Sequence, residues 1–85
     1  MEKITVLGII MANRSENAAQ VQKLLTEYGC NIKTRIGLHE VNEKLCSTSG
    51  LILLELFGDE VTCAELEKKL KALKGIQIQK MLFKI

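Results

Sequence analysis

Residues 3–11 read Lys-Ile-Thr-Val-Leu-Gly-Ile-Ile-Met and are rich in β-branched and apolar side chains. Both alternating sets of positions are apolar, whereas a strand with one face in water alternates apolar and polar residues. This pattern is typical of a strand in the centre of a sheet that is covered on both faces. Residues 51–57, Leu-Ile-Leu-Leu-Glu-Leu-Phe, repeat it with Glu55 as the one interruption. The sequence therefore predicts two central strands.

Each of these runs is followed by a stretch with helical periodicity, in which apolar residues recur every three or four positions opposite polar ones. The first stretch predicts a helix over about residues 16–28, ended by a left-handed Gly29; its stripe comprises Ala18, Val21, Leu25 and Tyr28. The second begins after Asp59 or Thr62, either of which can cap it, and ends at Gly75. Its stripe comprises Val61, Ala64, Leu66, Leu70 and Leu73.

Two further segments predict strands that are more polar. Residues 30–39 alternate apolar and polar side chains, which is typical of an edge strand with one face in water. The polar residues 40–49 predict a connecting loop that includes the frayed ends of the flanking strands, and residues 76–85 predict a last strand.

The predicted order is strand, helix, strand, strand, helix, strand, which comprises two split βαβ units. We therefore expect an α+β, ferredoxin-like βαββαβ sandwich with a four-stranded antiparallel sheet and two helices on one face. In this topology the first and third strands are central, in agreement with the two runs that are apolar throughout. At 85 residues the chain is expected to form a single domain over residues 1–85.

The second face of the sheet needs a cover, because both helices pack on the first face while the central strands offer apolar side chains to both. A soluble monomer seldom exposes a contiguous apolar patch of several hundred Å². The sequence therefore predicts a homo-oligomer, a homodimer or tetramer, that forms by stacking of sheets or by pairing of sheet edges.

Composition excludes several classes of protein. With 47% hydrophobic residues the chain is too apolar to be disordered, and with 26% charged residues it does not resemble a membrane protein. A net charge of +2 gives no support for direct nucleic-acid binding. The three cysteines, Cys30, Cys46 and Cys63, form no Cys-x-x-Cys pair and suit reduced thiols in the cytoplasm. We expect a cytoplasmic binding protein without catalytic residues, not an enzyme, and with no membrane partner.

One segment is a candidate ligand site. Arg14 lies just ahead of the first predicted helix, where free backbone amides favour an anion. We predict that the ligand-binding residues are Ala12, Asn13, Arg14 and Ser15. No phosphate cradle rich in glycine accompanies them, which argues against an acyl-phosphate hydrolase.

Two other groups of residues were considered as sites. His39 and Cys46, with Glu40 or Glu43, are too few for a tight metal site unless a second subunit contributes, so no metal or cofactor is predicted. Lys33 and Arg35 alternate with apolar residues and are expected to form, with His39, a solvated basic edge.

The chain resembles the ACT-like family of iron-only hydrogenase system regulators. The resemblance rests on the βαββαβ layout, on Ile4 to Met11 leading into Asn13-Arg14-Ser15-Glu16, on Ile36-Gly37-Leu38, and on residues 70–78, Leu-Lys-Ala-Leu-Lys-Gly-Ile-Gln-Ile. The resemblance implies an ACT-like domain with a regulatory role, related in fold to ACT domains and to the ligand-binding domain of the nickel-responsive repressor. Residues 11–15 lack the acidic residue and the glycine of an ACT effector loop, and the chain lacks the several histidines of the nickel site.

The expected function is that of a stand-alone regulatory domain of an iron-only hydrogenase system, which senses a small-molecule effector or docks onto a protein partner as an oligomer. Two alternatives stay open: a structural interaction module without a ligand, and a metal-responsive domain of the nickel type. An enzymatic function ranks third, after the regulatory and structural functions.

Overall fold

The computed structural model describes residues 3–11, 14–41 and 46–85, with side chains described outside 14–17 and 38–49. The elements are β1 (Lys3–Met11), α1 (Arg14–Glu27), a 3₁₀ turn (Gly29–Asn31), β2 (Ile32–Val41), β3 (Cys46–Leu56), α2 (Glu60–Lys71) and β4 (Ile76–Lys84). The strands form one antiparallel sheet in the order β2-β3-β1-β4. The predicted ferredoxin-like fold, with its two apolar runs in the central strands, is confirmed.

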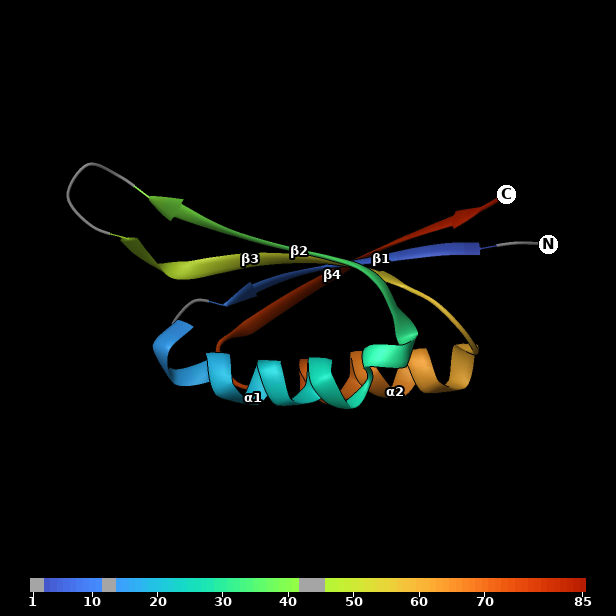
Figure 1. Ribbon diagram of the computed structural model, residues 1–85, viewed down its shortest axis with the longest axis horizontal. Helices are drawn as coiled ribbons and strands as arrows, with labels where there is room; N and C mark the ends of the chain where they lie inside the picture. The colour runs from blue at the N-terminus through green and yellow to red at the C-terminus, as the bar shows by residue number, and fades with distance from the viewer. Residues whose placement is uncertain (1–2, 12–13, 42–45) are drawn as a thin grey trace.

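Both helices lie on the same face of the sheet (Figure 1). Alternate residues of β1 and β3 point at them and are buried: Leu7, Ile9, Met11, Ile52, Leu54 and Leu56. The helices contribute Val21 and Leu25 from α1 and Leu66 and Leu70 from α2, and Tyr28 follows α1. Full burial of one such side chain stabilises the fold by about 1.5–3 kcal/mol, so this layer provides most of the apolar stabilisation.

A side-chain cap fixes the start of α2. The Thr62 backbone N–H donates to Asp59 Oδ1 at 2.8 Å, and the Thr62 hydroxyl donates to Asp59 Oδ2 at 2.6 Å. These bonds stabilise the ionised carboxylate and lower the pKa of Asp59. Asp59, and not Thr62, is therefore the cap. The helix ends earlier than predicted, at Lys71 with Ala72 as its C-cap, and Gly75, with a φ of 76°, lies just before β4.

A close approach between two turns requires Gly58, which has a φ of 100°. A Cβ atom at this position would lie 2.7 Å from Asn31 Nδ2. Asn31 Nδ2 donates to the Phe57 carbonyl at 3.0 Å, and the Phe57 N–H donates to the Asn31 carbonyl at 2.7 Å. The end of β3 is thereby tied to the 3₁₀ turn that precedes β2.

One local prediction is confirmed, and a second, the left-handed Gly29 at the end of α1, is wrong. Residues 40–49 include strand ends as expected, because β2 continues to Val41 and β3 begins at Cys46. An antiparallel ladder satisfies the backbone of polar residues as well as apolar ones, so polarity alone does not end a strand. Gly29 does not adopt a positive φ; the chain passes from α1 into the 3₁₀ turn instead.

Candidate functional site

The predicted ligand segment lies where β1 leaves the sheet. Met11, the last residue of β1, pairs with Gly50 of β3 and Ile76 of β4, and α1 begins three residues later at Arg14. Ala12 and Asn13 lie outside the described residues, and of Arg14 and Ser15 only the backbone, at the start of α1, is described. The assignment of Ala12, Asn13, Arg14 and Ser15 to a ligand stays a prediction.

The residues considered for a metal lie on the β2–β3 hairpin. His39 pairs with Gly50, and Cys46 pairs with Val41, two residues further along β2. Their side chains lie outside the described part of the structure, as does Glu43. Among the side chains that are described, no three of His, Cys, Asp or Glu gather closely enough to hold a metal ion.

A groove of about 920 Å³ is lined by residues of α2 and of all four strands. Its apolar lining includes Ile4, Leu56, Phe57 and Leu82. Three lysines and three glutamates also line it: Lys3, Lys33, Lys80, Glu55, Glu60 and Glu67. The sequence gives no local sign of this groove, because its charged residues come from segments far apart in the chain.

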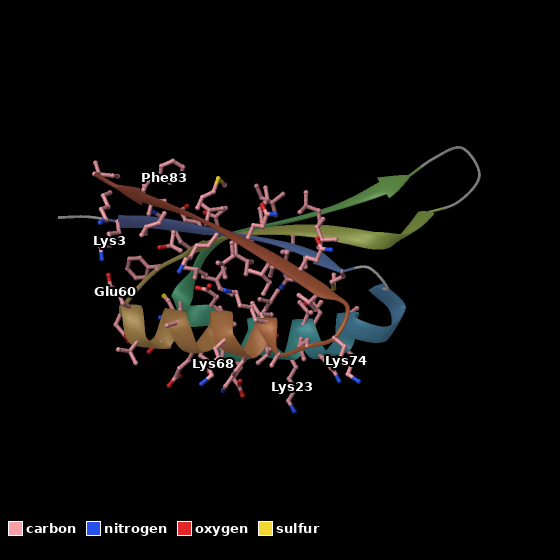
Figure 2. All side chains as sticks on the ribbon, turned by 180° about the vertical axis from the view of Figure 1, so that it is seen from behind. Lys3, Lys23, Glu60, Lys68, Lys74 and Phe83 are labelled. Carbon is pink, nitrogen blue, oxygen red and sulfur yellow. The ribbon has the colours of Figure 1, made fainter. Side chains whose placement is uncertain are left out.

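The charges of the groove are paired with one another. Lys3 Nζ lies 2.6 Å from Glu60 Oε1, and Figure 2 shows the two side chains facing each other. Lys80 Nζ lies 3.2 Å from Glu67 Oε1. Lys33 Nζ lies 4.0 Å from Glu55 Oε2. Lys3 lowers the pKa of Glu60 by a hydrogen bond and by its charge. With equal numbers of lysines and glutamates, the groove has no net preference for an anion or a cation.

Cys63 lines the same groove, and its thiol donates weakly to the Phe57 carbonyl at 3.5 Å. Desolvation raises the pKa of the Cys63 thiol, and the charges of Asp59 and Glu60 raise it further. The thiolate is the nucleophile and the metal ligand, so a raised pKa disfavours the reactive form of Cys63 at neutral pH.

Glu67 joins α2 to the edge of the sheet. Its carboxylate lies 2.8 Å from Lys71 Nζ, one turn later in α2, and also contacts Lys80 of β4; only 15% of its side chain is exposed. The hydrogen bond from Lys71, followed by that from Lys80, lowers the pKa of Glu67. This carboxylate therefore links α2 to β4 of the sheet.

We expect Glu67→Gln to lower the free energy of unfolding by about 0.5–1 kcal/mol at pH 7, a value kept small because both lysines are half exposed. A carboxylate with a depressed folded pKa stabilises above its unfolded pKa and loses that contribution as pH falls through the folded value. The difference between wild type and variant should therefore shrink below about pH 4. Urea unfolding of both proteins at pH 7 and pH 3 measures this difference in the free energy of unfolding. Glu27→Gln, which removes a half-exposed pair at 3.9 Å, is the control and should change little at either pH. An equal loss at both pH values would show that Glu67 does not act through its charge.

The face of the sheet opposite the helices is apolar, and we call it the open face. Its described apolar members are Ile4, Val6 and Ile10 of β1, Ile36 of β2, Leu51 and Leu53 of β3, and Met81 and Phe83 of β4. Figure 2 places Phe83 on the side of the sheet away from the helices. Ile36, Met81 and Phe83 are each about half exposed. The prediction that the central strands offer apolar side chains to both faces is confirmed.

The prediction for β2 needs a correction. Strict alternation put Ile32 and Ile36 on one face, but the register shifts between Ile32 and Thr34. Ile32 pairs with Leu56 and packs against the core, whereas Ile36 pairs with Leu53 on the open face. The irregularity moves the Ile36 side chain to the face without helices, as a β-bulge does.

Comparison with known proteins gives a family and a fold. Residues 3–80 match the TM1266-like family, described as "Iron-only hydrogenase system regulator, putative". No protein with a curated description matches the chain. In the described part of the chain, no helix is long and apolar enough to cross a bilayer.

Three solved structures show the range of similarity. The uncharacterized protein TM1266 from Thermotoga maritima has a TM-score of 0.80 and 28% identity, over 98% of this chain and 100% of that one. CPII, a nitrogen regulatory PII-like protein from Thiomonas intermedia K12 bound to ADP, AMP and bicarbonate, has a TM-score of 0.60 and 15% identity, over 99% and 93%. A dimeric ferredoxin-like protein from an uncultured marine organism has a TM-score of 0.53 and 13% identity, over 95% and 92%.

The last two likenesses concern the fold alone. The family match, in contrast, extends from the first residue of β1 into β4 and so takes in both βαβ units. The predicted resemblance is confirmed, and this chain belongs to the TM1266-like family of iron-only hydrogenase system regulators.

Proposed function

We propose that this chain is a cytoplasmic regulatory domain of an iron-only hydrogenase system, one ACT-like domain over residues 1–85 that acts by binding and not by catalysis. One observation carries the proposal: the regulator family matches residues 3–80, which include both helices and the three strands β1 to β3 entirely. The description therefore applies to this ferredoxin-like unit itself. Function of this kind requires a bound effector or partner.

The surroundings of the described titratable residues support binding over chemistry. Glu60 and Glu67 are held by lysines, and Asp59 caps α2. Cys63 has a raised pKa, which is the opposite of what an activated nucleophile needs.

We place the effector at Ala12, Asn13, Arg14 and Ser15. Arg14 begins a helix of 14 residues, and the first backbone N–H groups of a helix have no partner within it. These donors and a guanidinium favour a carboxylate or phosphate. A similar fold serves regulation in CPII, whose structure holds ADP, AMP and bicarbonate. We therefore propose an effector with an anionic group.

The test is a thermal unfolding screen of the purified protein with ADP, AMP, bicarbonate, inorganic phosphate and the amino acids. A ligand at 100 times its Kd stabilises the folded state by about 2.7 kcal/mol, a rise in Tm on the order of 10 °C for a domain of this size. Arg14→Ala should abolish the rise. Arg35→Ala, which removes the other arginine of the chain from an exposed strand position, should leave it intact.

Two results would contradict the effector site. No rise with any of these compounds would count against sensing of an anion, and an equal loss in both variants would place binding elsewhere.

The open face favours a second function, that of an interaction module without a small ligand. An apolar surface of this extent marks an interface with protein. We propose that the domain works as a homo-oligomer. The similar fold of the dimeric marine protein supports this proposal.

A further inference from the structure

The positions of the open face form rows across the sheet, because the ladders fix which residues are neighbours. One row contains Met81, Val6, Glu55 and Thr34, the next contains Gln79, Gly8, Leu53 and Ile36, and a third begins with Gln77, Ile10 and Leu51. The polar residues of the first two rows are Thr34 on the edge strand β2, Glu55 on β3 and Gln79 on the edge strand β4, and β1 contributes apolar side chains or glycine to all three rows. The apolar surface therefore runs along β1, and on β3 Glu55 is its one described charged interruption.

The face has one charged side chain among those described, and that charge is already compensated. Glu55 Oε1 accepts from the Thr34 hydroxyl at 3.1 Å, and Glu55 Oε2 lies 4.0 Å from Lys33 Nζ. Burial of a charge is costly when it leaves the charge without a partner. Coverage of this face would leave Glu55 with both of its partners.

The two edges of the sheet are charged, in contrast to the apolar open face. Lys33 and Arg35 are exposed on the edge strand β2, and Lys80 and Lys84 are exposed on the edge strand β4. Exposed lysines and arginines on edge strands oppose the addition of a further strand. Of the two ways in which a sheet can associate, this molecule resists edge pairing and leaves its face open to stacking.

The area suits a partner of the same size. Four strands about 4.8 Å apart and about eight residues long give a flat area of roughly 500 Å², and the relief of the side chains enlarges it. A standard interface buries about 800 Å² on each partner, so the open face is of that order. A surface that is apolar and nearly uncharged is complementary to itself, as a two-fold interface requires.

We propose that the open face is covered by the open face of a second copy of this chain, sheet stacked on sheet about a two-fold axis. This inference gives the geometry of the homo-oligomer in the proposed function and rests on that part of it. Aligned sheets pack about 10 Å apart, with the helices on the outside of the pair.

Substitutions on the open face test the inference. We expect the wild-type protein to be a dimer at micromolar concentration in native mass spectrometry and light scattering. Ile36→Glu and Met81→Glu introduce a charge at positions that are 47% and 51% exposed in the single chain, so each variant should fold and be a monomer. The control Val61→Glu lies on α2 at 72% exposure, away from the open face, and should remain a dimer. Circular dichroism checks that each variant is folded.

A milder variant keeps the test valid if the glutamates impair folding. Ile36→Thr keeps the β-branched shape that suits a strand, and it should raise the dimer dissociation constant at least about tenfold, or 1.4 kcal/mol. A wild-type tetramer that falls to a dimer in Ile36→Glu would also support a stacked face.

A wild-type monomer would overturn the inference, as would Ile36→Glu and Met81→Glu variants that stay dimeric. If a different protein covers the open face, the wild-type chain alone would be a monomer and the Ile36→Glu variant would no longer bind that protein. This result would also overturn the inference. The effector screen separates this outcome from failure of the regulatory proposal, because a monomeric wild-type protein that still gains stability with a ligand, dependent on Arg14, would contradict the stacked dimer alone.

Discussion

Leu54→Ala should lower the free energy of unfolding by about 3 kcal/mol, because it removes buried methyl groups and leaves a cavity that the surroundings fill only in part. The Leu54 side chain has 0% exposure and lies on β3 opposite Leu7 of β1, in the middle of the core between sheet and helices. A small domain has a total stability of about 5–15 kcal/mol, so the loss is a large part of the whole.

Urea unfolding followed by circular dichroism measures this loss, at one fixed protein concentration because association would also shift the midpoint. Val61→Ala is the control: Val61 is 72% exposed, and its truncation should change the stability by no more than about 0.5 kcal/mol. A loss below about 1 kcal/mol in Leu54→Ala would contradict the core, since even a well-tolerated leucine truncation costs more than this.

The neighbouring residue on β3 shows what the sequence could predict. Leu53 and Leu54 look alike in sequence, yet their side chains lie on opposite faces because successive residues of a strand alternate. A run that is apolar on both sets predicts a central strand with two covered faces, and the structure confirms the central positions of β1 and β3. The pattern also shows that the face without helices is apolar, which is the basis for expecting a second copy.

The sequence could not predict the face on which the outer part of β2 lies. Ile32, Thr34 and Ile36 alternate perfectly in the sequence, and nothing in the residue types marks the shift in register between Ile32 and Thr34. A bulge depends on how two strands pair, which a pattern within one strand does not contain. How far β2 and β3 extend into residues 40–49 could not be predicted for a related reason, since strand pairing extends over polar residues.

The groove beside α2 was beyond prediction because its charged pairs join distant segments. Lys3 and Glu60 are 57 residues apart in the chain, and only the fold brings their side chains to 2.6 Å. The one local sign is Glu67 with Lys71, four residues apart on one helix face, which is the spacing of a helical ion pair. That spacing predicts a helix surface and says nothing of the contact with Lys80. The predicted effector residues 12–15 remain a prediction for experiment.

Tyr28→Ala should lower the free energy of unfolding by about 3 kcal/mol, as expected for truncation of a buried aromatic residue. Tyr28 is 8% exposed and lies just after α1, where its N–H donates to the Leu24 carbonyl at 3.0 Å. Its ring packs in the core and lies 5.0 Å from Lys69 Nζ of α2. The ring therefore joins the two helices, which make few other contacts with each other.

Tyr28→Phe separates the ring from the hydroxyl. The Tyr28 hydroxyl donates to Glu65 Oε2 at 3.5 Å, the upper limit for a hydrogen bond, so its loss should cost no more than about 0.5 kcal/mol. The Tyr28 side chain also raises the pKa of Lys69, whose contribution is therefore present at neutral pH and lost only as pH rises through that raised value. Urea unfolding at pH 7 compares the three proteins, and a double-mutant cycle with Lys69→Met should show a favourable coupling between the cation and the ring. If Tyr28→Phe were as destabilising as Tyr28→Ala, the hydroxyl network and not the packed ring would hold α1 to α2.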